Sequence, residues 1–217
     1  RAYSDAPALF SPHPLFENFG ERVERSEACV RLGLDPANRY VLFFGLIRDY
    51  KGLDLLLDAW AQLRRAGRTE GRRLIVAGGF YTAREPYLNR IADNGLQDEV
   101  LLHDRFIPDD DVKYYFSAAD FVVQPYKTAT QSGVTQIAYN FELPMIVTDV
   151  GGLPEIVPDG RVGYVCRPDA AGVADALVRI CEGDTLARFR SAMREEKRRF
   201  SWEEMCDRIT ELYESIR

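Results

Sequence analysis

The chain has 217 residues, of which 46% are hydrophobic, and a net charge of −6. A chain of this length can bury roughly 70% of its unfolded surface, so it needs no disulfide or metal to fold. The mildly acidic, interspersed charge disfavours nucleic acid as a partner, because cationic contacts to phosphates dominate such binding. The four cysteines are scattered without a C-x-x-C pair, which indicates reduced thiols and excludes a zinc site. No apolar run reaches the roughly 18 residues of a membrane span.

Short apolar runs alternate with amphipathic segments from residue 40 onward. The runs predicted as buried strands are YVLFFG (40–45), RLIVAGG (73–79), EVLLHD (99–104), DFVVQP (120–125), PMIVTD (144–149) and GYVCR (163–167). The segments predicted as helices are 53–67, 84–95, 108–119, 134–141, a short one near 153–157, and most of the chain after residue 170. This alternation predicts an α/β fold, namely a doubly wound, Rossmann-like six-stranded parallel sheet with C-terminal helices.

The first 39 residues show no such alternation. Residues 1–20 are rich in proline and aromatic side chains and are predicted as an arm or linker, and residues 21–33 as a short lead-in helix. We therefore place a boundary between residues 39 and 40, with the ligand-binding domain over 40–217.

Two turns are predicted at the carboxyl edge of the sheet, where such sheets bind ligands. The first carries Arg48 and Lys51 directly before a helix, a pattern that suits a pyrophosphate. The second carries Ser132 and Gly133 at the start of the next helix, where glycine permits close approach of a ligand. The alternatives are solvated surface charges in the first turn and an ordinary serine-capped helix in the second. Together the turns predict a ligand that carries a diphosphate.

Two common nucleotide signatures are missing. Neither G-x-G-x-x-G nor G-x-x-x-x-G-K-[ST] occurs in the chain, which argues against hydride transfer and P-loop chemistry.

Five segments resemble the donor-binding, C-terminal half of family-4 (group 1) glycosyltransferases, in the same order. They are VLFFGLIRDYKGLDLLLDAWAQL, LIVAGG, DRFIPDDDVKYYFSAADFVVQPY, SGVTQIAYNFELPMIVTDVGGLPEIV and GYVCRPDAAGVADAL. The resemblance covers about residues 40–217 and implies one half of a GT-B fold, with residues 1–39 similar to the interdomain linker. The last helix, FSWEEMCDRITELY, resembles the segment that crosses back toward the other domain.

The resemblance also implies an activity. It implies retaining transfer of a sugar from a UDP- or GDP-sugar, without metal or other cofactor, to an acceptor held by an N-terminal domain. That domain would be missing here, as the lack of an initial methionine suggests, and the fragment alone would be inactive. The protein would be cytoplasmic, with any peripheral membrane contact made by the missing domain.

By the same resemblance, the donor diphosphate would bind at Gly45, Arg48 and Lys51, although Leu46 stands where the family's arginine usually does. The residues implied for the sugar and phosphates are Thr128, Gln131, Ser132, Gly133 and Val134. Gln136 would meet the ribose, and the backbone of Phe106 and Ile107 the base. No catalytic residue is implied by the sequence.

The chain departs from the family in a motif of two glutamates separated by seven residues, whose positions hold Thr128 and Gln136. A glutamine offers a neutral acceptor in place of a charged one, so weaker donor binding is expected. We favour a subfamily with a modified donor site over loss of transfer. The alternative for Gln136 is an ordinary helix surface residue.

Two other functions stay open from the sequence, a GT-B nucleotide-sugar epimerase and a non-catalytic nucleotide-sugar-binding domain. Five further residues are weaker candidates for which structural roles are the alternatives: His13, Tyr50, His103, Tyr126 and Glu155.

Overall fold

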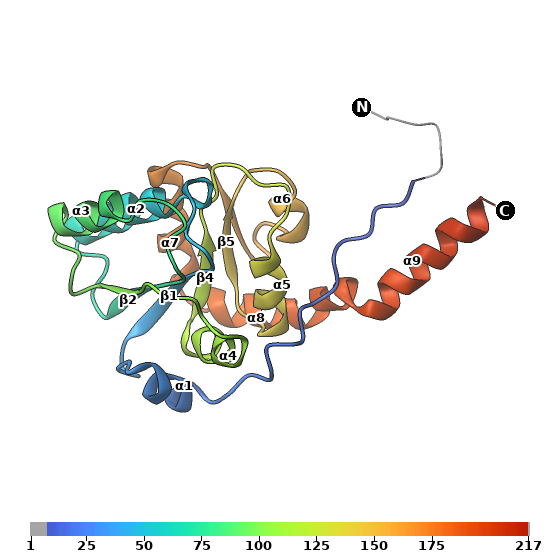
Figure 1. Cartoon of the computed structure of the whole chain (residues 1–217), viewed down its shortest axis with the longest axis horizontal. Coiled ribbons are helices and arrows are strands. Elements are labelled where there is room, and N and C mark those ends of the chain that lie inside the picture. The colour runs from blue at the N-terminus through green and yellow to red at the C-terminus, as the bar shows by residue number, and fades with distance from the viewer. Residues whose placement is uncertain (1–7, 217) are drawn as a thin grey trace.

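The structure, a computed structural model, describes residues 8–216 and is built around one twisted sheet (Figure 1). Its strands are β1 (Arg39–Phe44), β2 (Arg72–Ala77), β3 (Val100–His103), β4 (Phe121–Gln124), β5 (Met145–Thr148) and β6 (Gly163–Cys166). They pair in parallel in the order β3-β2-β1-β4-β5-β6. This is the doubly wound order, so the predicted fold class is confirmed, and the switch point lies between β1 and β4.

An α-helix follows each strand along the chain, and helices pack on both faces of the sheet. Those before β5 are α1 (Arg25–Leu32), α2 (Leu53–Arg65), α3 (Glu85–Asp93), α4 (Asp109–Ala118) and α5 (Gly133–Asn140). The later ones are α6 (Leu153–Ile156), α7 (Ala170–Ile180), α8 (Thr185–Glu196) and α9 (Trp202–Ser215). Two 3-10 turns are η1 (Asp49–Lys51) and η2 (Lys197–Phe200).

Each face of the sheet packs against its own hydrophobic core, because successive side chains of a strand point to opposite sides. Val41 and Phe43 of β1 join the core under α2, α3 and α7. Tyr40 and Leu42 join the core under α1, α4 and α5. The strands are buried on both sides, which explains why they read as continuous apolar runs in the sequence.

Helix α8 connects the two cores across the amino-terminal edge of the sheet. Its Phe189 belongs to the core of α2 and α7, whereas Met193, one turn later, belongs to the core of α4 and α5. This edge lies opposite the one where the β1 and β4 loops emerge (Figure 1).

The N-terminal region contacts this body through its helix and through the arm before it. The predicted lead-in helix begins at Arg25, four residues later than expected, and its Ala28 and Cys29 are fully buried against α4. Before it, the arm runs past α5 toward α9, and the Leu15 N–H donates to the Phe200 carbonyl at 2.9 Å. The boundary at residue 39 stays a prediction.

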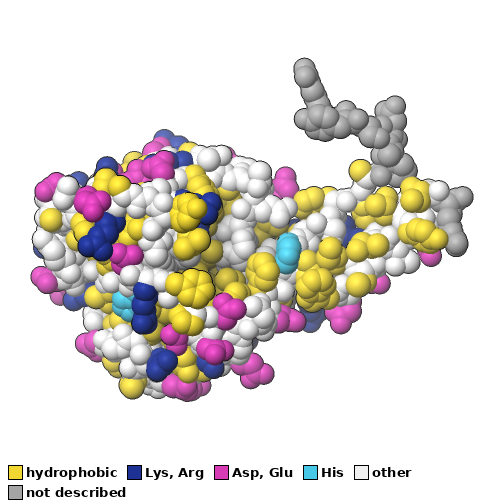
Figure 2. Space-filling view, in the orientation of Figure 1, with side chains coloured by type: hydrophobic (Ala, Val, Ile, Leu, Met, Phe, Trp, Pro, Cys, Tyr) yellow, Lys and Arg dark blue, Asp and Glu magenta, His cyan; other side chains and the backbone are white. Residues whose placement is uncertain are grey.

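Helix α9 projects from the body and buries none of its residues (Figure 1). Figure 2 shows apolar side chains along this helix and the neighbouring arm. The large exposed ones are Leu9, Phe10, Trp202, Ile209, Tyr213 and Ile216. Along the described part of the chain, no helix combines the length and the apolar character that crossing a membrane requires.

Candidate functional site

A groove of about 270 Å³ opens at the carboxyl ends of β1 and β4. Its lining comes from the arm, the loops after β1 and β4, and α5. It consists of Phe16, Phe19, Tyr50, Lys51, Tyr126, Gln131, Ser132, Gly133, Val134 and Ile137. Lys51 and Gly133 therefore border one groove, where the rule for switch points places ligand sites.

Lys51 ends η1 and is only 9% exposed. Within residues 8–216 it has no carboxylate partner within 4.0 Å. Burial, together with the smaller effect of the nearby Arg48 charge, lowers the pKa of its ammonium to about 8. A buried ammonium without a counter-charge gains from any anion that enters the groove.

Gly45 lies at the end of β1, and its lack of a side chain provides the space that the Lys51 ammonium occupies. Its φ of 97° lies in the region that favours glycine. A Cβ atom at this position would approach Lys51 Nζ to 2.9 Å. Any larger residue would therefore displace the ammonium.

Ser132 fixes the start of α5 at the opposite side of the groove. Its hydroxyl donates to Oε1 of Gln124 at 2.6 Å and accepts from the Val134 N–H at 3.2 Å, so it caps the helix. The Tyr126 hydroxyl lies 3.2 Å from the Ser132 hydroxyl oxygen, and burial raises the pKa of Tyr126 to about 12. The alternative of a serine cap is thus correct, and Gly133, the first residue of α5, lies in the groove wall.

Lys127, in the loop after β4, contacts η1 and the start of α2. Its ammonium lies 2.9 Å from carboxylate oxygens of both Asp49 and Asp54, and its N–H donates to the Tyr50 carbonyl at 2.7 Å. Its charge is therefore neutralised, in contrast to that of Lys51.

Phe16 brings the arm into the groove, which the sequence did not predict. One of its ring carbons lies 3.2 Å from where a Cβ on Gly133 would be, so a larger residue at this position would crowd the ring. The arm shows no periodicity, and its aromatic content is the one signal that could have suggested this contact.

Comparison with known proteins establishes the family. The sequence model described as "Glycosyl transferases group 1" matches residues 38–183. The chain belongs to the group 1 glycosyltransferases. It is 30% identical over 228 residues to the lipopolysaccharide core biosynthesis mannosyltransferase LpsB of Rhizobium meliloti, a match over 99% of this chain and 63% of that protein.

Solved glycosyltransferase structures share the fold. The sucrose-phosphate synthase of Thermosynechococcus elongatus superposes with a TM-score of 0.79 at 25% identity, over 94% of this chain and 51% of that one. HepE of Anabaena, in complex with UDP and glucose, superposes with a TM-score of 0.69 at 23% identity, over 88% of this chain and 52% of that one. The chain spans about half the length of the curated relatives it matches, from 40% to 63%.

Several residues that the resemblance to this family implied lie outside the groove lining. The Arg48 guanidinium lies over the Tyr81 ring, 4.4 Å from its centroid. Thr128 is exposed in the loop after β4. In the loop after β3, Phe106 is 74% exposed and Ile107 is buried. Their roles in donor binding stay predictions.

Gln136 is not a surface residue, so that alternative is wrong. Its side chain lies on α5 with 3% exposure, and its Oε1 atom is buried without a hydrogen-bond partner. It is absent from the groove lining, and a ribose contact would require the side chain to turn toward the groove. The unsatisfied carbonyl is nevertheless an acceptor that a ligand hydroxyl could satisfy.

Gln136→Met is expected to separate the cost of the unsatisfied carbonyl to stability from its contribution to ribose binding. An unpaired buried acceptor costs about 1–3 kcal/mol, so the apolar substitute should stabilise the unliganded chain by about 1 kcal/mol. If the carbonyl serves the ribose, UDP affinity should fall about fivefold. Urea unfolding and calorimetry with UDP measure both effects, with Gln62→Met, an exposed helix position, as the control. A less stable variant with unchanged affinity would contradict the prediction.

The weaker candidates have structural partners or lie away from the groove. His103 Nδ1 lies 2.8 Å from the Tyr115 hydroxyl, and burial lowers the pKa of the imidazole. His13 stacks on Phe16 with centroids 4.7 Å apart. Glu155 is exposed in α6 and makes no capping hydrogen bond. Tyr50 and Tyr126 do border the groove, in edge contact at 5.9 Å. Nowhere in the described chain do three acidic, histidine or cysteine side chains cluster as metal ligands.

Proposed function

We propose that this chain is the donor-binding half of a retaining glycosyltransferase and that the groove between η1 and α5 holds a nucleoside-diphosphate sugar. The observation that carries the proposal is the unpaired, buried ammonium of Lys51 facing the start of α5 across one groove. Membership in the group 1 family supports it. The complex of HepE with UDP and glucose makes UDP the first nucleotide to test and GDP the second.

The groove suits the charge that develops during transfer. When the bond between sugar and diphosphate breaks, negative charge grows on the departing diphosphate. The Lys51 ammonium and the backbone N–H groups that begin α5 can stabilise it from two sides. The acceptor would be held by a second domain, against which the apolar face of α9 would pack.

One observation favours the non-catalytic alternative. The described residues that line the groove include no carboxylate and no histidine. The same lack counts against the epimerase, which needs acid–base groups. Incubation of the full-length protein with a labelled nucleotide sugar separates the three functions. A glycosylated acceptor supports the transferase, and an epimerised sugar supports the epimerase. Binding without turnover supports the non-catalytic binding domain.

Gly45→Ala tests the site itself. The added Cβ would press on Lys51 Nζ, so we expect UDP or GDP affinity to fall about tenfold or more, as for loss of a charge-assisted contact. Gly160→Ala is the matched control, because Gly160 also has a positive φ, 73°, yet a Cβ there meets nothing within 4 Å. Calorimetry measures both variants. Equal affinity in the two variants would remove the groove as the donor site.

A further inference from the structure

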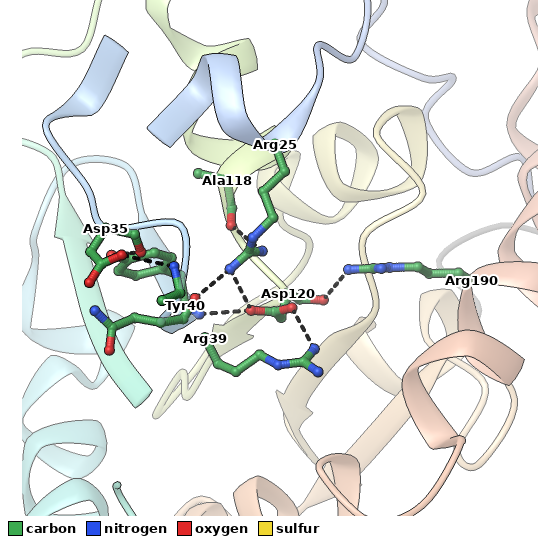
Figure 3. A network of polar contacts seen from close by, with 9 residues as sticks. Arg25, Asp35, Arg39, Tyr40, Ala118, Asp120 and Arg190 are labelled. Carbon is green, nitrogen blue, oxygen red and sulfur yellow. Dashed lines mark hydrogen bonds and ion pairs between the residues drawn. The ribbon is translucent and has the colours of Figure 1, made fainter. Parts of the chain in front are cut away.

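A second cationic region lies at the amino-terminal edge of the sheet, far from the groove. Two cavities of about 340 and 370 Å³ meet there, and Arg39, Asp120 and Arg190 line both. The first lies between the starts of β1, β2 and β4 and helix α8, and the second lies under α1. Figure 3 shows Arg25, Arg39 and Arg190 reaching toward Asp120 from different elements.

The two cavities carry more positive than negative charge. Their lining includes five arginines, Arg22, Arg25, Arg39, Arg72 and Arg190, and two acids, Asp120 and Asp184. The Asp120 carboxylate is already engaged, because it pairs with Arg25 and Arg39 at 3.4 and 3.2 Å and accepts the Tyr40 N–H. Within residues 8–216, the other three arginines have no carboxylate within 4.0 Å.

Arg190 is the least satisfied member of this cluster. Its guanidinium donates to the Asp120 backbone carbonyl at 3.1 Å, and its Nε is buried without a partner. Burial lowers the pKa of Arg190, and so do the charges of Arg22, Arg25 and Arg39, against the opposing effect of Asp120. A half-buried guanidinium that faces like charges is stabilised by an anion in the adjacent cavity.

We propose that these cavities bind a small phosphate-bearing anion, held by Arg190 together with Arg39 and Arg72. Guanidinium groups bind phosphate oxygens through paired, charge-assisted hydrogen bonds, and a small turn of the Arg190 side chain would let an anion here supply the acceptor that its buried Nε lacks. The site is concave, and two of its arginines, Arg72 and Arg190, are half-buried, which favours a free phosphate or phosphate ester over a flat lipid surface. Because it borders α8 and the starts of the central strands, the anion would act as a ligand distinct from the donor.

Inorganic phosphate is the probe, titrated into the 217-residue chain at constant ionic strength with chloride as the replaced anion. We expect the Arg190 Nε–H resonance to shift and calorimetry to show saturable binding. Since phosphate can also enter the groove at Lys51, the titration is repeated in Gly45→Ala, where the Arg190 response should persist. Vesicles of phosphatidylcholine with phosphatidic acid form a second arm: retention of the chain that Arg190→Gln abolishes would identify a lipid headgroup as the source of the phosphate.

Arg190→Gln should weaken phosphate binding roughly tenfold. Arg188→Gln is the matched control, since Arg188 lies on the same helix over the Phe189 ring and outside both cavities. If Arg190→Gln unfolds the chain, Arg39→Gln replaces it, because the Arg39 side chain is 69% exposed. Two results would overturn the proposal. One is an Arg190 resonance that does not shift at millimolar phosphate, together with no retention of the chain on vesicles. The other is equal phosphate binding by the wild type, Arg190→Gln and Arg39→Gln.

Discussion

Replacing Lys51 with methionine is expected to weaken nucleoside diphosphate binding about tenfold or more and, at neutral pH, to stabilise the unliganded chain. Both effects have one cause, the burial of an ammonium that no carboxylate of the described chain neutralises. Its loss removes a charge-assisted contact to the diphosphate, worth about 1.5–3 kcal/mol. The loss also removes the cost of keeping a charge out of water.

The pH dependence of stability provides the check on this cause. Burial lowers the pKa of Lys51 from 10.5 to about 8 in the folded chain. Between these values the unfolded chain binds one proton more, so this group makes stability rise with pH across that window. The advantage of Lys51→Met should therefore be largest below pH 8, at about 3 kcal/mol, and vanish toward pH 10.5.

Urea unfolding of both proteins at several pH values, with calorimetry using UDP, measures the two effects. Lys113→Met is the control, because Lys113 is a half-buried lysine on α4 near the Tyr114 ring. It should neither weaken UDP binding nor give a stability gain that disappears as the pH rises. Wild-type affinity for UDP should also fall above pH 8 as the free ammonium loses its proton. A methionine variant that binds UDP as the wild type does would separate Lys51 from the donor site.

The sheet could be predicted from sequence because each strand is buried on both faces. YVLFFG and PMIVTD read as uninterrupted apolar runs for that reason, and the helices between them carry one apolar stripe each. Once the strand order was expected, the switch-point rule placed Lys51 and Gly133 at one edge without knowledge of any side-chain position.

The remaining features of the groove depend on contacts between distant residues, which local patterns do not encode. The arm has no periodicity that would predict Phe16 against Gly133. Gln124 reads as part of a strand predicted to end at Pro125, and its hydrogen bond to Ser132 appears only when the loop folds back. Arg48 and Lys51 looked equivalent in the sequence, yet one stacks on Tyr81 and the other lines the groove.

Asp120→Ala is expected to destabilise the chain by about 1.5–3 kcal/mol, because it removes a buried carboxylate that makes charge-assisted hydrogen bonds and ion pairs. The carboxylate is 5% exposed and pairs with Arg25 and Arg39. Its second role is to accept the Tyr40 N–H at 2.8 Å, at the start of β1. Loss of Asp120 thus affects the attachment of α1 and the pairing of β1 with β4 together.

Asp58→Ala is the matched control for this prediction. Asp58 forms a 2.6 Å pair with Arg90, but both side chains are about a third exposed, 37% and 34%. Water screens such a pair, so its loss should cost about 1 kcal/mol or less. Urea unfolding measures both variants, and Asp120→Asn replaces the alanine variant if that one does not fold. Because Asp120 lies at the edge opposite the groove, UDP affinity of the folded variant should stay at the wild-type value. Similar losses of stability in Asp120→Ala and Asp58→Ala would show that burial does not govern the strength of the Asp120 contacts.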